Sequence, residues 1–298
     1  MSRLLFTGLA PAVITPMFED GSVDYQAFER LIEHLIQQGA KALVINGTTA
    51  EATTLTSEEK AKLVSIASRI SNKRVPIIAG AGSNHTQASI EASKLSKEAG
   101  ADALLLVTPY YNKTSQRGLI AHFEAIVNAV ELPAILYTVP GRTGMNILPD
   151  TLVTLAKNPY IVGIKDATGN TAYTMEILEK TKDLDFAVYS GEDGLILPMM
   201  AAGVKGVISV VGNVFPSVTQ DLCEAVLNQD LEKAKSLAFD LAPLIRLLFA
   251  DVNPIPAKSA MAYLGYGQDM CRLPLVPTEN DLREKIEKEI TRLQEMGY

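Results

Sequence analysis

The feature that most constrains the fold is a regular alternation of short apolar runs with amphipathic segments. Eight apolar runs recur about every 20 to 34 residues. They occupy residues 8–17, 42–49, 75–82, 103–111, 133–140, 161–168, 186–193 and 206–213. Helical patterns lie between them, at residues 24–39, 57–71, 85–100, 115–130 and 170–183. Strands that alternate with helices form parallel sheets, because each helix carries the chain back for the next strand.

Eight such units favour a closed barrel over an open, doubly wound sheet. After residue 213 only helical patterns follow, at residues 215–249 and 278–296, with an irregular proline-rich stretch between them. We therefore predict an α/β fold, a (β/α)8 TIM barrel with a C-terminal helical extension. The barrel is expected over residues 1–225 and a helical domain over residues 226–298.

One lysine stands where a buried strand of this barrel should end. In barrel enzymes the chemistry lies at the C-terminal ends of the strands and in the loops that follow. Within the apolar run 161–168, Lys165 follows Ile161-Val162-Gly163-Ile164, at the point where the strand should end. Burial disfavours the charged form of an amine, and a neutral amine is a nucleophile for carbonyl carbon. The plainer interpretation is that Lys165 leaves the strand end and pairs with Asp166 or another carboxylate.

Hydroxyl groups and one arginine accompany this lysine at other strand ends. Thr48 and Thr49 would hold a substrate carboxylate and join a proton relay, or would simply cap the next helix. The Tyr137 phenol would pass protons to and from a Schiff base, or would bind a backbone carbonyl. Arg142 lies in a Gly-Arg-Thr-Gly loop, where it would clamp a carboxylate or bond local carbonyls.

Other classes of protein lack support in the sequence. The run Gly80-Ala81-Gly82 has His85 where a dinucleotide-binding loop needs its third glycine. The three histidines have no metal-ligand spacing, and no Gly-x-Ser-x-Gly motif supports a hydrolase. We therefore expect neither metal nor nicotinamide.

The formal net charge of −7 argues against nucleic acid as a partner. No apolar stretch approaches the 18 residues or so that a membrane span needs, and no signal peptide is recognisable. Two distant cysteines, Cys223 and Cys271, are typical of reduced thiols. We expect a cytoplasmic protein.

Seven short motifs, in this order, together resemble the dihydrodipicolinate synthase (4-hydroxy-tetrahydrodipicolinate synthase) family. This family belongs to the pyruvate-dependent class I aldolases, and the resemblance covers nearly the whole chain. The motifs are GLAPAVITPM at 8–17, GTTAE at 47–51, TPYYNK at 108–113, YTVPGRTG at 137–144, GIKDATG at 163–169, YSGED at 189–193 and NPIPAK at 253–258.

The resemblance implies a role for each residue at the centre of the site. Lys165 would form a Schiff base with pyruvate, and Tyr137 would donate and accept its protons. Thr48 and Tyr111 would complete a relay to solvent. In the family, the tyrosine at the position of Tyr111 comes from the partner across a tight dimer interface. The protein would therefore be a homo-oligomer, at least a dimer. Members of the family are often dimers of dimers.

The resemblance also assigns the substrate carboxylates. Thr49 and the backbone at Ile208 would bind pyruvate, and Arg142 would bind the second substrate, L-aspartate 4-semialdehyde. No cofactor would be required. Lysine-inhibited members carry polar side chains near the dimer interface; here the corresponding positions hold Ser57, Lys60 and Ala88, with Asn84 and Tyr110 retained. We expect weak or absent inhibition by lysine.

Two alternatives differ from this assignment. A sibling aldolase, such as N-acetylneuraminate lyase or a 2-keto-3-deoxy sugar acid aldolase, would share Lys165 and Tyr137, but Arg142 favours a small carboxylated aldehyde. A catalytically silent pyruvate-binding regulator would not need the intact set of Lys165, Tyr137, Thr48 and Tyr111.

Overall fold

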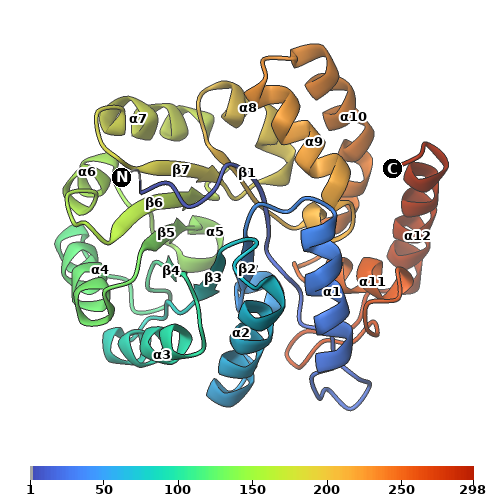
Figure 1. The fold of residues 1–298 in the computed structure, drawn as a ribbon, viewed down its shortest axis with the longest axis horizontal. Helices are drawn as coiled ribbons and strands as arrows, with labels where there is room; N and C mark the ends of the chain where they lie inside the picture. Colours follow the sequence, from blue (N-terminus) through green and yellow to red (C-terminus); the bar gives the residue numbers. More distant parts are fainter. Residues whose placement is uncertain (1–2) are drawn as a thin grey trace.

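A barrel of eight parallel strands forms the centre of the molecule in a computed structural model that describes residues 3–298 (Figure 1). The strand order is β1-β8-β7-β6-β5-β4-β3-β2. The ring closes between β1 and β2, where the Val13 amide donates to the Val44 carbonyl oxygen at 2.9 Å. The predicted (β/α)8 barrel is confirmed. The strands are β1 (Gly8–Pro11), β2 (Leu43–Ile45), β3 (Ile77–Gly80), β4 (Ala103–Val107), β5 (Ala134–Thr138), β6 (Ile161–Asp166), β7 (Ala187–Ser190) and β8 (Gly206–Ser209).

Helices surround the barrel and connect successive strands (Figure 1). A capping box begins α2: the Glu59 amide donates to Thr56 Oγ1 at 3.2 Å, and the Thr56 amide donates to the Glu59 carboxylate at 2.8 Å. The barrel helices are α1 (Tyr25–Gln37), α2 (Ser57–Ser71), α3 (Thr86–Glu98), α4 (Gln116–Val130), α5 (Pro140–Thr143), α6 (Pro149–Leu155), α7 (Thr171–Thr181), α8 (Ile196–Ala201) and α9 (Pro216–Leu227). Three short 3-10 turns follow strand ends: η1 (Thr48–Ala50), η2 (Asp193–Leu195) and η3 (Val211–Asn213).

Two apolar clusters explain why every strand has a mostly apolar sequence. One cluster fills the inside of the barrel, with Val44, Ile78 and Ile135 among its members. The other lies between the strands and the helices, with Leu43, Leu104 and Leu136. Because side chains alternate along a strand, each strand contributes to both clusters. Polar side chains are left for the strand ends.

The C-terminal region differs in detail from the prediction. The expected single helix at 215–249 is two helices, α9 and α10 (Leu231–Leu248), because Gln229 between them takes a left-handed φ of 63°. The stretch expected to be irregular contains α11 (Ile255–Tyr263). Proline is tolerated in the first helical turn, so Pro256 does not prevent this helix. The last helix is α12 (Asn280–Glu295), within the predicted range.

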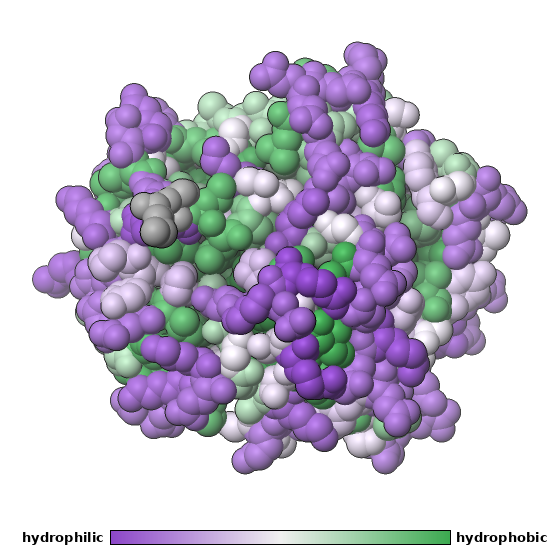
Figure 2. All heavy atoms as spheres, viewed as in Figure 1, coloured by the Kyte–Doolittle hydropathy of each residue, from purple (hydrophilic) through white to green (hydrophobic). Residues whose placement is uncertain are grey.

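Figure 2 shows hydrophilic residues at the periphery of this face and in a band across its middle, with apolar residues visible between them. This distribution fits helices that turn one apolar face toward the barrel. Within residues 3–298, no helix combines the length and the apolar character that crossing a bilayer requires.

Candidate active site

An amine and a phenol lie side by side at the C-terminal end of the barrel. Tyr137 on β5 and Lys165 on β6 are register partners in the sheet. Each exposes 7% of its surface. The Lys165 Nζ atom lies 4.5 Å from the centroid of the Tyr137 ring. The structure therefore brings together the two side chains that the sequence placed at the centre of the site.

Asp166 does not form an ion pair with Lys165. Its carboxylate accepts hydrogen bonds from the Thr168 amide at 2.9 Å, from Thr168 Oγ1 at 2.7 Å and from Thr174 Oγ1 on α7 at 2.7 Å. Successive side chains of a strand point to opposite faces, so Asp166 faces α7 while Lys165 faces the barrel interior. No carboxylate of residues 3–298 forms an ion pair with Lys165. The plainer interpretation of Lys165 is therefore wrong.

Gly191, directly after β7, leaves the space that the Lys165 side chain occupies. A Cβ atom at this position would lie 2.8 Å from Lys165 Cε and 2.7 Å from Ala167 Cβ. The Gly191 amide donates to the Asp166 carbonyl oxygen at 2.7 Å, which ties the ends of β6 and β7 together. Any side chain here would displace the lysine or separate these strand ends. This glycine lies within the YSGED motif, and the sequence alone gave no sign of its role.

The two threonines lie on η1, directly after β2. Thr49 is buried and Thr48 is half-buried. The Asn253 side-chain amide donates to Thr49 Oγ1 at 3.0 Å. Because the oxygen accepts this bond, the Thr49 hydroxyl keeps its own hydrogen for another acceptor, such as a carboxylate. The interpretation of Thr49 as an anion-binding group is thus chemically consistent with its surroundings.

Arg142 lies exposed on α5, just beyond Tyr137. Its Nη2 atom donates to the Asn253 carbonyl oxygen at 2.9 Å. This carbonyl belongs to a residue 111 positions away, so the bond is not to a local carbonyl. Asn253 therefore contacts both side chains that were expected to bind carboxylates, Thr49 and Arg142. Sequence reasoning missed this role, although the NPIPAK motif contained the residue.

Tyr111 is not part of the same cluster. It is 95% exposed, and its backbone takes a left-handed φ of 67°. Among the hydrogen bonds of residues 3–298, none joins Tyr137 to Thr48 or to Tyr111. The hydrogen bonds of a single chain thus do not assemble the predicted relay.

On the opposite side of Lys165, an acidic residue secures the end of β8. Ile208 is buried and pairs with Ala10 of β1. Just beyond it, the Val210 and Val211 amides donate to Asp193 Oδ2 at 2.9 and 2.7 Å. Burial raises the pKa of the Asp193 carboxyl, while these amide bonds act in the opposite direction. Asp193 therefore holds the segment whose backbone was expected to bind pyruvate, another role that the sequence did not reveal.

Within residues 3–298, no hydrogen bond joins a histidine or cysteine side chain to Lys165, Tyr137 or Thr49. His122 Nδ1 shares a hydrogen bond of 2.9 Å with Thr86 Oγ1 between α4 and α3. Cys223 and Cys271 are buried and unpaired, and burial raises the pKa of the Cys271 thiol to about 12. Across residues 3–298, no three His, Cys, Asp or Glu side chains cluster in a way that could hold a metal ion.

Fold and site together define the class: a (β/α)8-barrel enzyme with a buried lysine beside a tyrosine at the C-terminal end of adjacent strands. Residues 5–293 match the dihydrodipicolinate synthetase family model. The chain is 49% identical over 283 residues to a 4-hydroxy-tetrahydrodipicolinate synthase of Macrococcus caseolyticus, covering 95% of each chain. It is 44% identical over 288 residues to that of Alkaliphilus oremlandii, covering 97% of this chain and 99% of the relative.

A solved structure agrees with these relatives. The chloride-inhibited dihydrodipicolinate synthase from Acinetobacter baumannii, complexed with pyruvate, aligns with a TM-score of 0.93 and 44% identity. The alignment covers 96% of this chain and 98% of that one. The chain belongs to the dihydrodipicolinate synthetase family. Its activity is that of a 4-hydroxy-tetrahydrodipicolinate synthase, a lyase of lysine and diaminopimelate biosynthesis.

Proposed function

We propose that the enzyme condenses pyruvate with L-aspartate 4-semialdehyde through a Schiff base on Lys165. The observation that carries this proposal is the pairing of Lys165 with Tyr137, whose ring centroid lies 4.5 Å from the amine. The related Acinetobacter baumannii structure with pyruvate supports the first substrate.

The chemistry needs one amine and a group that moves protons. The Lys165 amine attacks the pyruvate carbonyl carbon, and loss of water leaves an iminium ion, which accepts electrons. The pyruvate methyl group then loses a proton and becomes an enamine carbon that attacks the aldehyde. Tyr137 would donate and accept the protons of these steps. The amine of the second substrate finally adds to the imine carbon and releases Lys165.

Three groups would orient the two substrates. The Thr49 hydroxyl, already accepting from Asn253, would donate to the pyruvate carboxylate. The backbone at Ile208, on the strand that Asp193 secures, would complete that pocket. Arg142 would bind the carboxylate of the aldehyde, since a guanidinium forms two parallel bonds with a carboxylate.

Turnover of the two substrates, coupled to the next reductase and followed by loss of reduced nicotinamide, tests this function. We expect activity in the wild-type enzyme. In Arg142→Ala we expect a raised KM for the aldehyde with an unchanged KM for pyruvate. Arg30→Ala, an exposed arginine on α1, is the matched control and should behave as wild type. Turnover with a sugar acid but not with the aldehyde would instead indicate a sibling aldolase.

We propose that the active unit is at least a dimer, and a dimer of dimers by family resemblance. The exposure of Tyr111 supports a role in a partner's site, where it and Thr48 would form the relay from Tyr137. Complementation tests this arrangement. Tyr111→Ala and Lys165→Ala chains, each inactive alone, should regain activity when they are unfolded together and refolded, since one site of each hybrid has both residues. No recovery in verified hybrids would contradict the shared site.

Two further expectations accompany this proposal. We propose that residues 226–298 act as a helical domain that helps to build the mouth of the barrel, which the contacts of Asn253 support. We also propose a cytoplasmic location, in keeping with two unpaired cysteines. Fractionation of cells that produce the full chain tests the location, and recovery in a membrane or exported fraction would contradict it.

A further inference from the structure

A buried ion pair lies two residues beyond the threonines of the site. The Glu51 carboxylate and the Lys258 ammonium meet at 2.5 Å, with 1% and 0% of their side chains exposed. Glu51 follows η1 directly, and Lys258 lies on α11, 207 residues further along the chain. Burying such a pair costs free energy, because both charged groups lose their contacts with water. The pair is stable only if its geometry is good and further hydrogen bonds satisfy the charged groups. Its position therefore calls for an explanation.

Glu51 has the further bond that such burial requires. Its second carboxylate oxygen accepts from the Arg272 amide at 2.8 Å. Its backbone φ is 55°, a left-handed value that glycine adopts more easily than glutamate. The contacts of the side chain must offset this conformational cost. Glu51 therefore keeps this conformation because of the bonds that its carboxylate makes, since the backbone conformation alone would favour glycine.

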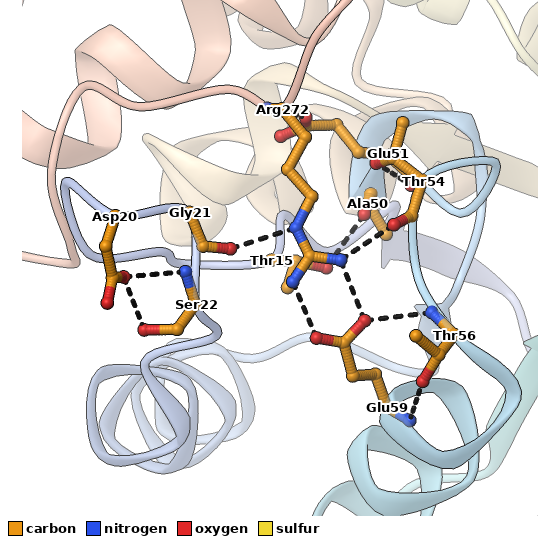
Figure 3. Close-up of polar contacts among 10 residues, drawn as sticks. All are labelled: Thr15, Asp20, Gly21, Ser22, Ala50, Glu51, Thr54, Thr56, Glu59 and Arg272. Atoms are coloured by element: carbon orange, nitrogen blue, oxygen red, sulfur yellow. Dashed lines mark hydrogen bonds and ion pairs between the residues drawn. The ribbon is translucent and has the colours of Figure 1, made fainter.

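Arg272 connects Glu51 to Glu59, as Figure 3 shows. Its guanidinium makes two bonds to the Glu59 carboxylate, at 2.6 and 2.8 Å, and further bonds to the carbonyl oxygens of Thr54 and Gly21. Glu59 lies on α2, whereas Glu51 directly adjoins η1. In this network Glu51 is the inner member, next to the active-site turn η1, and Glu59 is the outer member, on α2.

We propose that Glu51 is a positioning residue for the active site. Its carboxylate, held between Lys258 and the Arg272 amide, fixes the end of η1 and so fixes the direction of the Thr48 and Thr49 hydroxyls. The C-terminal helices thereby set the pyruvate-binding geometry from inside the protein. This inference rests on the proposed roles of the two threonines.

The most direct test shortens the carboxylate by one methylene and keeps its charge. Glu51→Asp would draw the turn toward Lys258 or lose the contact. A displacement of about 1 Å at a substrate-positioning group costs up to about a hundredfold. We expect the KM for pyruvate to rise about tenfold, with a smaller change in the KM for the aldehyde. Borohydride should still trap pyruvate on Lys165 at saturating pyruvate.

Glu59→Asp is the matched control, because it makes the same change in the outer member of the network. Both variants should lower the unfolding temperature. Only Glu51→Asp should raise the KM for pyruvate; Glu59→Asp should stay within about twofold of wild type. Equal effects of the two changes on the KM, or no effect of either, would overturn the proposal and leave a merely structural network.

A second variant separates position from charge. Glu51→Gln/Lys258→Met removes both buried charges at similar volume, so its unfolding temperature should approach or exceed the wild-type value. The KM for pyruvate should nevertheless stay raised; a KM that returns to wild type with the stability would count against the proposal. Wild-type enzyme that neither turns over nor is trapped by pyruvate would instead contradict the proposed function itself.

Discussion

Adding one methyl group at Gly191 should disable the active site without disrupting the barrel. The new Cβ would lie 2.8 Å from Lys165 Cε, and carbon atoms in ordinary contact are about 3.5 to 4.0 Å apart. Lys165 must therefore move by about 1 Å, away from its place beside Tyr137. Misplacement of a reacting group by about 1 Å costs about 10²-fold in rate, so we expect kcat/KM to fall about a hundredfold in Gly191→Ala.

The assay follows condensation by the coupled reductase and records the unfolding temperature of the same preparations. Overpacking should cost about 1 to 3 kcal/mol of stability, which leaves the protein folded. Gly194→Ala is the matched control: it lies three residues away on η2, and no heavy atom would lie within 4 Å of its new Cβ. The control should keep wild-type activity. A Gly191→Ala enzyme with wild-type kcat/KM would show that the position of Lys165 beside Tyr137 is not required.

Three further predictions follow from the site and its surroundings. Tyr137→Phe should lower turnover by about 10²-fold or more while borohydride still traps pyruvate on Lys165; full turnover would exclude the phenol as the proton-transfer group. L-lysine should inhibit weakly or not at all, because Lys60 would repel its ammonium and Ala88 offers it no side-chain hydrogen bond; inhibition at submillimolar lysine would contradict this. Hydrogen bonding to Arg272 lowers the pKa of Glu59 below its ordinary 4.5, so the stability it contributes is present above that pH and is lost as pH falls through the lower, folded-state value. Urea unfolding should show Glu59→Gln to be less stable than wild type by about 1 to 3 kcal/mol near pH 7, with the gap narrowing in acid, and a constant gap would refute this.

The barrel and its central residues could be predicted because they leave local signals. A buried parallel strand is a continuous apolar run, and a polar side chain at its end stands out against that run. Lys165 and Tyr137 end neighbouring strands, so the strand order of a barrel brings them together. The apolar run 161–168 alone did not show whether Lys165 faces the barrel interior or the helices. The register of β6 against β5 places it beside Tyr137, toward the interior.

The supporting contacts left no such signal, because they join segments far apart in the chain. Asn253 and Thr49 are 204 positions apart, and Glu51 and Lys258 are 207 apart. No periodicity relates such residues, and their pairing depends on how the C-terminal helices pack against the barrel. The helix α11 was missed for a local reason, since proline suggested a loop where it occupies a first helical turn. Tyr111 is 95% exposed in the single chain, and its proposed place in a partner's site leaves no signal in one sequence.

The central claim is that Lys165 carries the reaction, and borohydride reduction in the presence of pyruvate tests it most directly. Reduction of the wild-type enzyme, followed by digestion and mass spectrometry, should place one reduced pyruvate on the peptide that contains Lys165 and abolish turnover. Lys165→Met should be neither labelled nor active, whereas Lys94→Met, which removes an exposed lysine of α3, should be labelled at Lys165 as wild type is. Label on another lysine, or full turnover by Lys165→Met, would contradict the account.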